Sequence, residues 1–215
     1  MKASSISFAI CVIAAVFVGT FFPGAPVAAQ TMIQTSRVSA GFTHMEVFDA
    51  AGADTFTVPA GITRIMVEVR GAGGGGGKGN TGTAVGQGGS GGGYGMGIFA
   101  VTPLSDHTVT VGAGGLGSNG GNCTVGGPGG TSSLGLLISA TGGGGGGGCG
   151  TSSTPGSSSA PLNSDGQEGH QYFHPTGSPE NPGGLCGDGS TTGLGGAGNA
   201  FFGRDGEDGN VVVFW

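Results

Sequence analysis

The sequence predicts an all-β protein with a small antiparallel sheet or sandwich as its base and packed glycine-rich segments joined to it. Three observations lead to this fold class. Apolar residues come in blocks of strand length, glycine accounts for 55 of the 215 residues, and no window has a convincing helical period. Hydrophobic residues reach 36% and charged residues only 8%, whereas disordered chains are rich in charge and poor in apolar residues. The composition therefore argues against wholesale disorder.

Residues 1–29 are predicted to be a secretory signal peptide. Lys2 precedes an apolar run from Ile6 to Phe22, and Val27–Ala29 supplies small residues for cleavage. An uncleaved membrane anchor is the alternative, but the apolar run is interrupted and short for a membrane span. The mature chain is expected to start near Gln30, to lack a later transmembrane segment, and to be secreted or held at the cell surface, extracellular or periplasmic.

Residues 30–54 are expected to form an extended or β segment ahead of a glycine-rich β domain over residues 55–215. The clearest strand of that domain is Ile62–Arg70, in which Ile65, Val67 and Val69 point to one face. This period-two pattern is typical of a half-buried antiparallel strand. Further strands are expected at residues 42–48, 55–58, 97–101, 107–111, 132–140 and 211–215.

Glycine runs connect these strands. Gly71–Gly77 follows the 62–70 strand and Gly142–Gly148 follows Ala140, and further runs occupy residues 86–97, 112–121 and 183–198. A single flexible linker does not explain several runs that each join strands. Extended polyproline-II backbone has three residues per turn and no internal hydrogen bonds, so neighbouring segments can satisfy each other's N–H and C=O groups. We therefore expect one packed layer of polyglycine-II-type segments.

The order of these blocks resembles a known family. Phe56–Gly77, then Ile98–Pro103 with Val109–Gly115, then Asp205–Val213 resemble the opening, middle and end of the glycine-rich domain of phage tail-fibre tip adhesins and some bacterial surface proteins. The resemblance covers residues 56–215. It implies a β-structured base, a lattice of polyglycine-II helices and variable loops at one end that bind receptors. The predicted signal peptide departs from phage tail proteins, which assemble inside the host cell, and favours a secreted or surface role.

Three cysteines lie outside the signal peptide: Cys123, Cys149 and Cys186. An oxidising compartment favours a disulfide, and three cysteines allow three single pairings. A Cys149–Cys186 bridge is favoured because it would close the long insertion over residues 149–186, with a stabilisation of roughly 4 kcal/mol in the chain-entropy model. One thiol would then remain for an intermolecular link.

The same insertion is the candidate recognition loop. Its stretch Ser152–Pro182 is poorer in glycine than its surroundings and carries four residues with aromatic or imidazole rings: His170, Tyr172, Phe173 and His174. Aromatic faces beside polar groups suit a sugar ring or a protein surface, and recognition usually sits on loops of a rigid scaffold. An ordinary surface loop without a ligand is the alternative.

Other motif matches have simpler explanations. Gly71–Gly76 satisfies G-x-G-x-x-G, but the sequence after it does not predict the helix that would hold a phosphate. His170 and His174 could join Cys149 and Cys186 in a zinc site, but the pair is not on a predicted helix and the disulfide competes for the cysteines. Asp205–Asp208 could offer oxygens to calcium, but an acidic turn before the last strand explains these carboxylates equally well. We therefore expect no metal, no cofactor and no enzymatic activity.

A net charge of −6 and only six Lys and Arg residues argue against a nucleic-acid partner, because such binding depends on phosphate neutralisation. The sequence predicts a secreted, non-enzymatic protein that acts in adhesion or surface recognition of a cell-surface glycan or protein receptor. The alternative is a structural subunit of an extracellular fibre or matrix, in which residues 30–40 pair with a neighbour's sheet edge.

Overall fold

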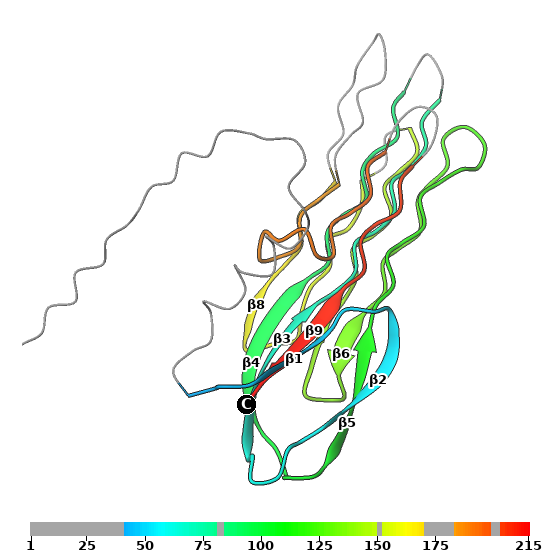
Figure 1. The fold of residues 1–215 in the computed structure, drawn as a ribbon. Helices are drawn as coiled ribbons and strands as arrows, with labels where there is room; N and C mark the ends of the chain where they lie inside the picture. The colour runs from blue at the N-terminus through cyan, green and yellow to red at the C-terminus, as the bar shows by residue number, and fades with distance from the viewer. Residues whose placement is uncertain (1–40, 81–83, 150–151, 170–182, 199–202) are drawn as a thin grey trace, which may run out of the picture. The chain divides into compact units, whose positions relative to one another are not determined.

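The computed structural model describes residues 41–80, 84–149, 152–169, 183–198 and 203–215 (Figure 1). These ranges fall within the second of two compact units of the chain, Val38–Trp215. They contain nine strands: β1 (Met45–Phe48), β2 (Gly52–Thr57), β3 (Arg64–Arg70), β4 (Tyr94–Ala100), β5 (Asp106–Val111), β6 (Ser132–Leu134), β7 (Ile138–Ala140), β8 (Leu162–Ser164) and β9 (Asn210–Phe214). Within the same ranges there is no helix long and apolar enough to span a membrane.

The strands form two antiparallel sheets, which confirms the all-β prediction. One sheet has the order β1-β9-β3-β4-β8 and the other has the order β2-β5-β6-β7. The C-terminal strand β9 lies between β1 and β3, so both ends of the described chain meet in one sheet. The expected domain boundary between residues 54 and 55 falls inside β2.

The predicted strand over residues 132–140 is two strands. The chain reverses at Gly135, whose φ of +49° lies in the left-handed region that favours glycine. Leu137 N then donates to Leu134 O, and β6 pairs with β7 as a short hairpin. Leu136 stands fully exposed at its tip.

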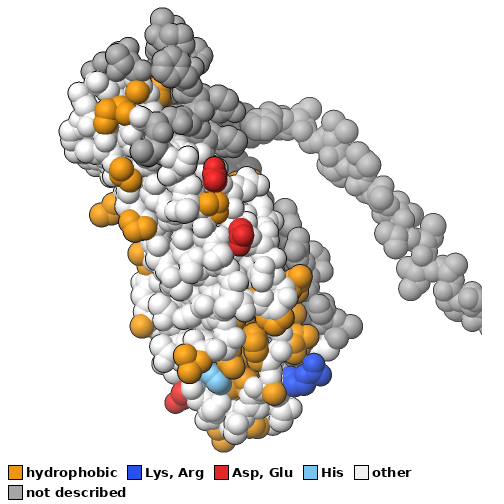
Figure 2. Space-filling view, turned by 180° about the vertical axis from the view of Figure 1, so that it is seen from behind, with side chains coloured by type: hydrophobic (Ala, Val, Ile, Leu, Met, Phe, Trp, Pro, Cys, Tyr) orange, Lys and Arg blue, Asp and Glu red, His pale blue; other side chains and the backbone are white. Residues whose placement is uncertain are grey.

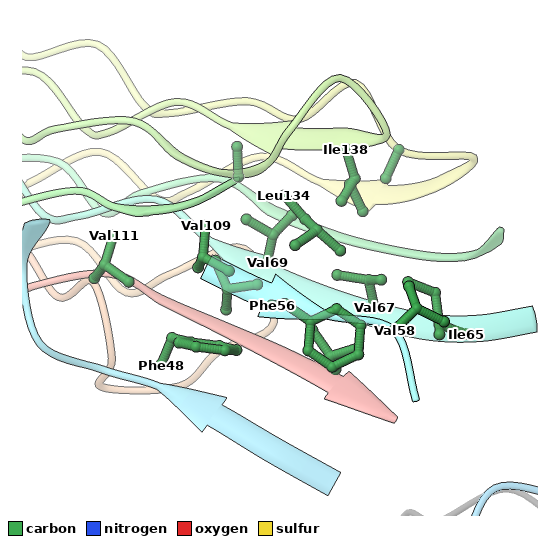
Figure 3. Packing of buried hydrophobic residues seen from close by; sticks show 14 residues of the cluster. Phe48, Phe56, Val58, Ile65, Val67, Val69, Val109, Val111, Leu134 and Ile138 are labelled. Carbon is green, nitrogen blue, oxygen red and sulfur yellow. The ribbon is translucent and has the colours of Figure 1, made fainter. Parts of the chain in front are cut away.

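The apolar core lies between the two sheets (Figure 3). Ile65, Val67 and Val69 of β3 are fully buried, as the period-two pattern predicts, and they belong to the same cluster as Val109 and Leu134 from the other sheet. The opposite face of β3 is also buried, since Met66 packs with Val212 and Phe214 and only 3% of Met66 is exposed. The strand predicted as half-buried is therefore buried on both faces.

Glycine-rich segments continue from the strands and run side by side (Figure 1). Segment 71–78 lies among them, and every third N–H group along it donates to the same neighbour. The pairs are Gly71, Gly74 and Gly77 with Gly93, Ser90 and Gln87; Ala72, Gly75 and Lys78 with Gly130, Gly127 and Thr124; and Gly73 and Gly76 with Glu207 and Arg204.

The carbonyl groups of segment 71–78 accept from three further neighbours. Gly143 and Gly146 donate to Ala72 and Gly75, Gly115 and Ser118 donate to Gly73 and Gly76, and Gly196 donates to Gly74. The N···O distances of the bonds that the segment accepts and donates are all 2.7 to 3.1 Å. Six other segments therefore hydrogen-bond to this one.

The distance between these segments requires glycine. A Cβ atom placed on any of the glycines from Gly71 to Gly77 would come within 1.9 to 2.3 Å of a carbonyl oxygen of a neighbouring segment. Larger residues occur where a segment faces solvent, as for Leu116, which is 72% exposed, and Val125, which is 61% exposed. The glycine runs thus pack backbone against backbone.

Candidate functional site

The hydrogen bonds between neighbouring glycine segments show which end of each segment lies near the sheets and which end lies away from them. At the sheet end Gly71 donates to Gly93, the residue before β4, whereas at the other end Gly77 donates to Gln87 and Gln87 donates to Gly147. We call this second end the distal end and define it by Gly77, Gln87, Thr124 and Gly147. Cys149 lies two residues after Gly147, so the candidate loop starts here.

The four candidate recognition residues, His170, Tyr172, Phe173 and His174, lie outside the described residues. The chain on both sides of them is described. Gln167 N donates to Leu185 O at 2.8 Å and Gly184 N donates to Gly89 O at 2.9 Å. The two stems of the loop are therefore hydrogen-bonded to each other and to segment 86–93.

A groove of about 520 Å³ lies beside these stems. Gln167 and Leu185 from the loop stems line it, together with Leu194 from segment 193–198 and Glu207 from the segment that leads into β9. The rest of the wall is formed by Gly183, Gly195, Gly196, Ala197, Arg204 and Asp205. The groove combines apolar side chains with polar groups, a mixture that ligand sites commonly show.

The disulfide joins Cys123 to Cys149, so the favoured Cys149–Cys186 pairing is not the one that forms. Cys149 lies at the distal end, whereas the Cys186 Sγ lies 3.7 Å from Gly93 O at the sheet end. The register of the segments thus keeps these two cysteines apart. A bridge with the observed separation of 26 residues contributes about 3 to 4 kcal/mol in the chain-entropy model, and it ties two distal chain reversals together.

Cys186 is a free, buried thiol. Burial, together with the neighbouring Asp188 carboxylate, raises the pKa of the Cys186 thiol. The thiolate is the reactive form of cysteine, so this thiol stays protonated at neutral pH. The predicted intermolecular link through a spare cysteine would therefore require Cys186 to leave its buried position.

A buried ionic cluster lies on the outer face of β3. Arg70 Nε donates to Asp188 Oδ2 at 2.8 Å, and an Arg70 terminal nitrogen lies 3.2 Å from Glu68 Oε2. The guanidinium also lies over the Tyr94 ring, 5.0 Å from its centroid, and donates to Asn210 Oδ1 at 3.3 Å. The cluster ties the 186–190 turn to the sheet.

The charges of this cluster compensate each other. Burial opposes the charge of Arg70, but the hydrogen bond and the charge of Asp188, together with smaller effects of Glu68 and Tyr94, outweigh burial and raise the Arg70 pKa. Burial likewise opposes ionisation of Asp188, but the hydrogen bond from Arg70, the hydrogen bonds from Ser190 and the charge of Arg70 together outweigh burial, so the Asp188 pKa is lowered. The sequence pattern placed Glu68 and Arg70 on the outer face, but it gave no sign that the distant Asp188 would cover them.

Several residues of the alternative metal sites have protein partners in the described part of the chain. Asp205 Oδ1 accepts from Gly117 N at 2.6 Å and Asp208 Oδ1 accepts from Gly114 N at 2.7 Å, so both carboxylates hold backbone amides. No three His, Cys, Asp or Glu side chains within the described ranges are arranged to hold a metal ion. Of the zinc candidates, His170 and His174 lie outside those ranges and Cys149 is in a disulfide.

Comparison with protein families identifies the domain. The family model of the glycine-rich domain matches residues 49–213, which cover β2 to β8, all of β9 but its last residue and all of the glycine segments, but not β1. No curated protein matches the chain. The chain therefore belongs to the glycine-rich domain family.

Proposed function

We propose that this is a secreted, non-enzymatic protein that recognises a cell-surface glycan or protein receptor through the loop of residues 149–186, which carries His170, Tyr172, Phe173 and His174. The observation that carries the proposal is the placement of the loop stems. Both stems are hydrogen-bonded to segment 86–93, Gln167 O accepting from Gly91 N and Gly184 N donating to Gly89 O. A loop with fixed stems loses less conformational freedom when it binds a partner.

We further propose that the glycine segments are polyglycine-II helices packed in a lattice. The three-residue repeat of hydrogen-bond partners along segment 71–78 and its six neighbours support this, because an extended helix of three residues per turn points successive groups in three directions. Such a scaffold would be stiff, since bending one segment would break bonds to several others. The face in Figure 2 carries few charged side chains, which suits a scaffold built mainly from main chain.

The resemblance to phage tail-fibre tip adhesins also supports recognition by distal loops. In that family, loops at one end of the glycine lattice bind receptors. The groove beside the loop stems offers Leu185 and Leu194 for apolar contact and Gln167 and Glu207 for hydrogen bonds. We propose that receptor binding uses this groove together with the loop.

The double substitution of Tyr172 and Phe173 by alanine is expected to weaken receptor binding at least about tenfold, because aromatic side chains commonly dominate binding energy. The measurement is binding of purified mature protein to glycan arrays and to intact cells. Leu136→Ala is the matched control, since Leu136 is a fully exposed apolar residue on the β6–β7 turn. The proposal fails if the wild-type protein binds nothing or if the double variant binds as the control does.

A structural fibre or matrix subunit is the second candidate. β1 and β8 are the edge strands of the five-stranded sheet, and Met45 and Val47 of β1 are each 40% exposed. An exposed edge strand can accept a strand from a neighbouring molecule. Electron microscopy of the native material distinguishes the candidates, because a strictly monomeric species rules out the fibre.

A further inference from the structure

A buried polar cluster interrupts the glycine packing at the base of the recognition loop. Gln87 and Ser90 are three residues apart on segment 86–93 and meet Ser153 and Gly169 from the insertion. Gln87 and Ser153 are each 4% exposed and Ser90 is fully buried. Side chains inside the packed glycine layer are unusual in this fold, so their contacts are informative.

These side chains hold the backbone of Gly169 on both sides. Gln87 Nε2 donates to Gly169 O at 3.0 Å, and Gly169 N donates to Ser153 Oγ at 3.4 Å. Gly169 is the residue immediately before His170. A Cβ on Gly169 would also lie 2.0 Å from Gly88 O, so the first loop stem is fixed by contact as well as by hydrogen bonds.

The two hydroxyl groups of this cluster already donate to other oxygens. Ser90 Oγ donates to Ser153 Oγ at 2.6 Å, and Ser153 Oγ donates to Gly88 O at 3.5 Å. Among the described residues, Gln87 Oε1 is the buried side-chain oxygen without a hydrogen-bond partner. Turning the amide over would place two acceptors, Gln87 Oε1 and Gly169 O, against each other, so the hydrogen-bond network fixes the amide orientation.

We propose that one water molecule binds at Gln87 Oε1 and that this hydrated joint of Gln87, Ser90 and Ser153 sets the position of the recognition loop. A buried carbonyl oxygen without a donor is costly, and buried waters typically satisfy such groups. The three residues of the joint and Gly169 supply neutral oxygens and no carboxylate. Water fits them better than a cation, because a buried charge needs a compensating partner.

The proposed water at Gln87 Oε1 is tested by crystallography of the mature protein. An ordered water is expected within about 2.7 to 3.2 Å of Gln87 Oε1. A protein N–H or O–H donating to that oxygen would overturn the proposal. So would an anomalous peak at the same position in crystals soaked in rubidium chloride, since it would show a cation site.

The proposed role of Ser153 in holding Gly169 is tested with Ser153→Ala and the matched control Ser132→Ala. Ser132 is also fully buried, and its Oγ accepts from Gly112 N at 3.0 Å at the sheet end. Loss of one such bond should speed hydrogen exchange of the Gly169 amide about fivefold, with no change at Gly169 in the control. Equal exchange at Gly169 in the two variants would contradict the joint.

The functional consequence rests on the proposed receptor binding. Ser153→Ala and the isosteric Gln87→Met are expected to weaken binding several-fold, whereas Ser132→Ala leaves it unchanged. If Gln87→Met does not fold, the binding affinity of Ser153→Ala alone tests this consequence. Absence of receptor binding by the wild-type protein would overturn the proposed function. The crystal structure and the hydrogen-exchange rates would still show whether the water is bound and whether Ser153 holds Gly169.

Discussion

Gly74→Ala is expected to lower the free energy of unfolding by at least about 4 kcal/mol, enough to prevent stable folding of a marginal domain. The added Cβ would lie 2.1 Å from Gly144 O and 2.5 Å from Gly144 C. Both are backbone atoms of another packed segment, so no side chain can rotate away. The clash can be relieved only if the packed segments separate, and they would then lose several hydrogen bonds. Urea denaturation of the mature protein measures the effect.

Gly121→Ala is the matched control for this substitution. A Cβ on Gly121 would meet nothing within 4 Å, so the change in unfolding free energy should stay within about 0.5 kcal/mol. The two variants differ only in which glycine carries the methyl group. Similar stability of Gly74→Ala and Gly121→Ala would contradict the close packing of the glycine segments.

Arg70→Met is expected to cost about 3 to 5 kcal/mol, because removing one partner of a buried ion pair leaves the other charge uncompensated. Here Asp188 and Glu68 would both lose their cation. Arg64→Met is the control, since Arg64 lies on the same strand but is exposed. Chemical denaturation of the two variants gives the comparison, and equal losses would show that the cluster contributes little.

The same cluster predicts a pH dependence. Asp188 has a lower pKa in the folded chain than its ordinary value, so its carboxylate stabilises the fold above the unfolded-state pKa of about 3.9. This contribution is lost as the pH falls through the folded-state pKa, which lies below that value. The acid-induced loss of stability is expected to be smaller in Arg70→Met, because its Asp188 no longer gains a guanidinium partner.

The strands with clear patterns were predictable from sequence. The alternation around Val67 predicts β3, and the apolar run from Val211 predicts β9. β8 was missed because Leu162-Asn-Ser has neither alternation nor an apolar run, and it forms only by pairing with β4. The single strand predicted across Gly135 was wrong because sequence alone does not reveal that this glycine adopts a left-handed turn.

The electrostatic and covalent links were less predictable, because they depend on register between distant segments. Cys123 and Cys149 meet because their segments end together, while Cys186 lies near the sheet. Loop length alone favoured the wrong partner. Arg70 and Asp188 are likewise 118 residues apart, and the pairing follows only from where the 186–190 turn lies on the sheet.

The account rests on the claim that bare backbone, packed on neighbouring backbone, replaces side chains as the interior beyond the two sheets. Residue-resolved amide hydrogen exchange on the mature protein tests this most directly. The amides of Gly74, Gly75 and Gly76, which donate at 2.8 to 2.9 Å, are predicted to exchange as slowly as those of β3. Exchange of these three amides at the rate of an unstructured peptide would contradict it.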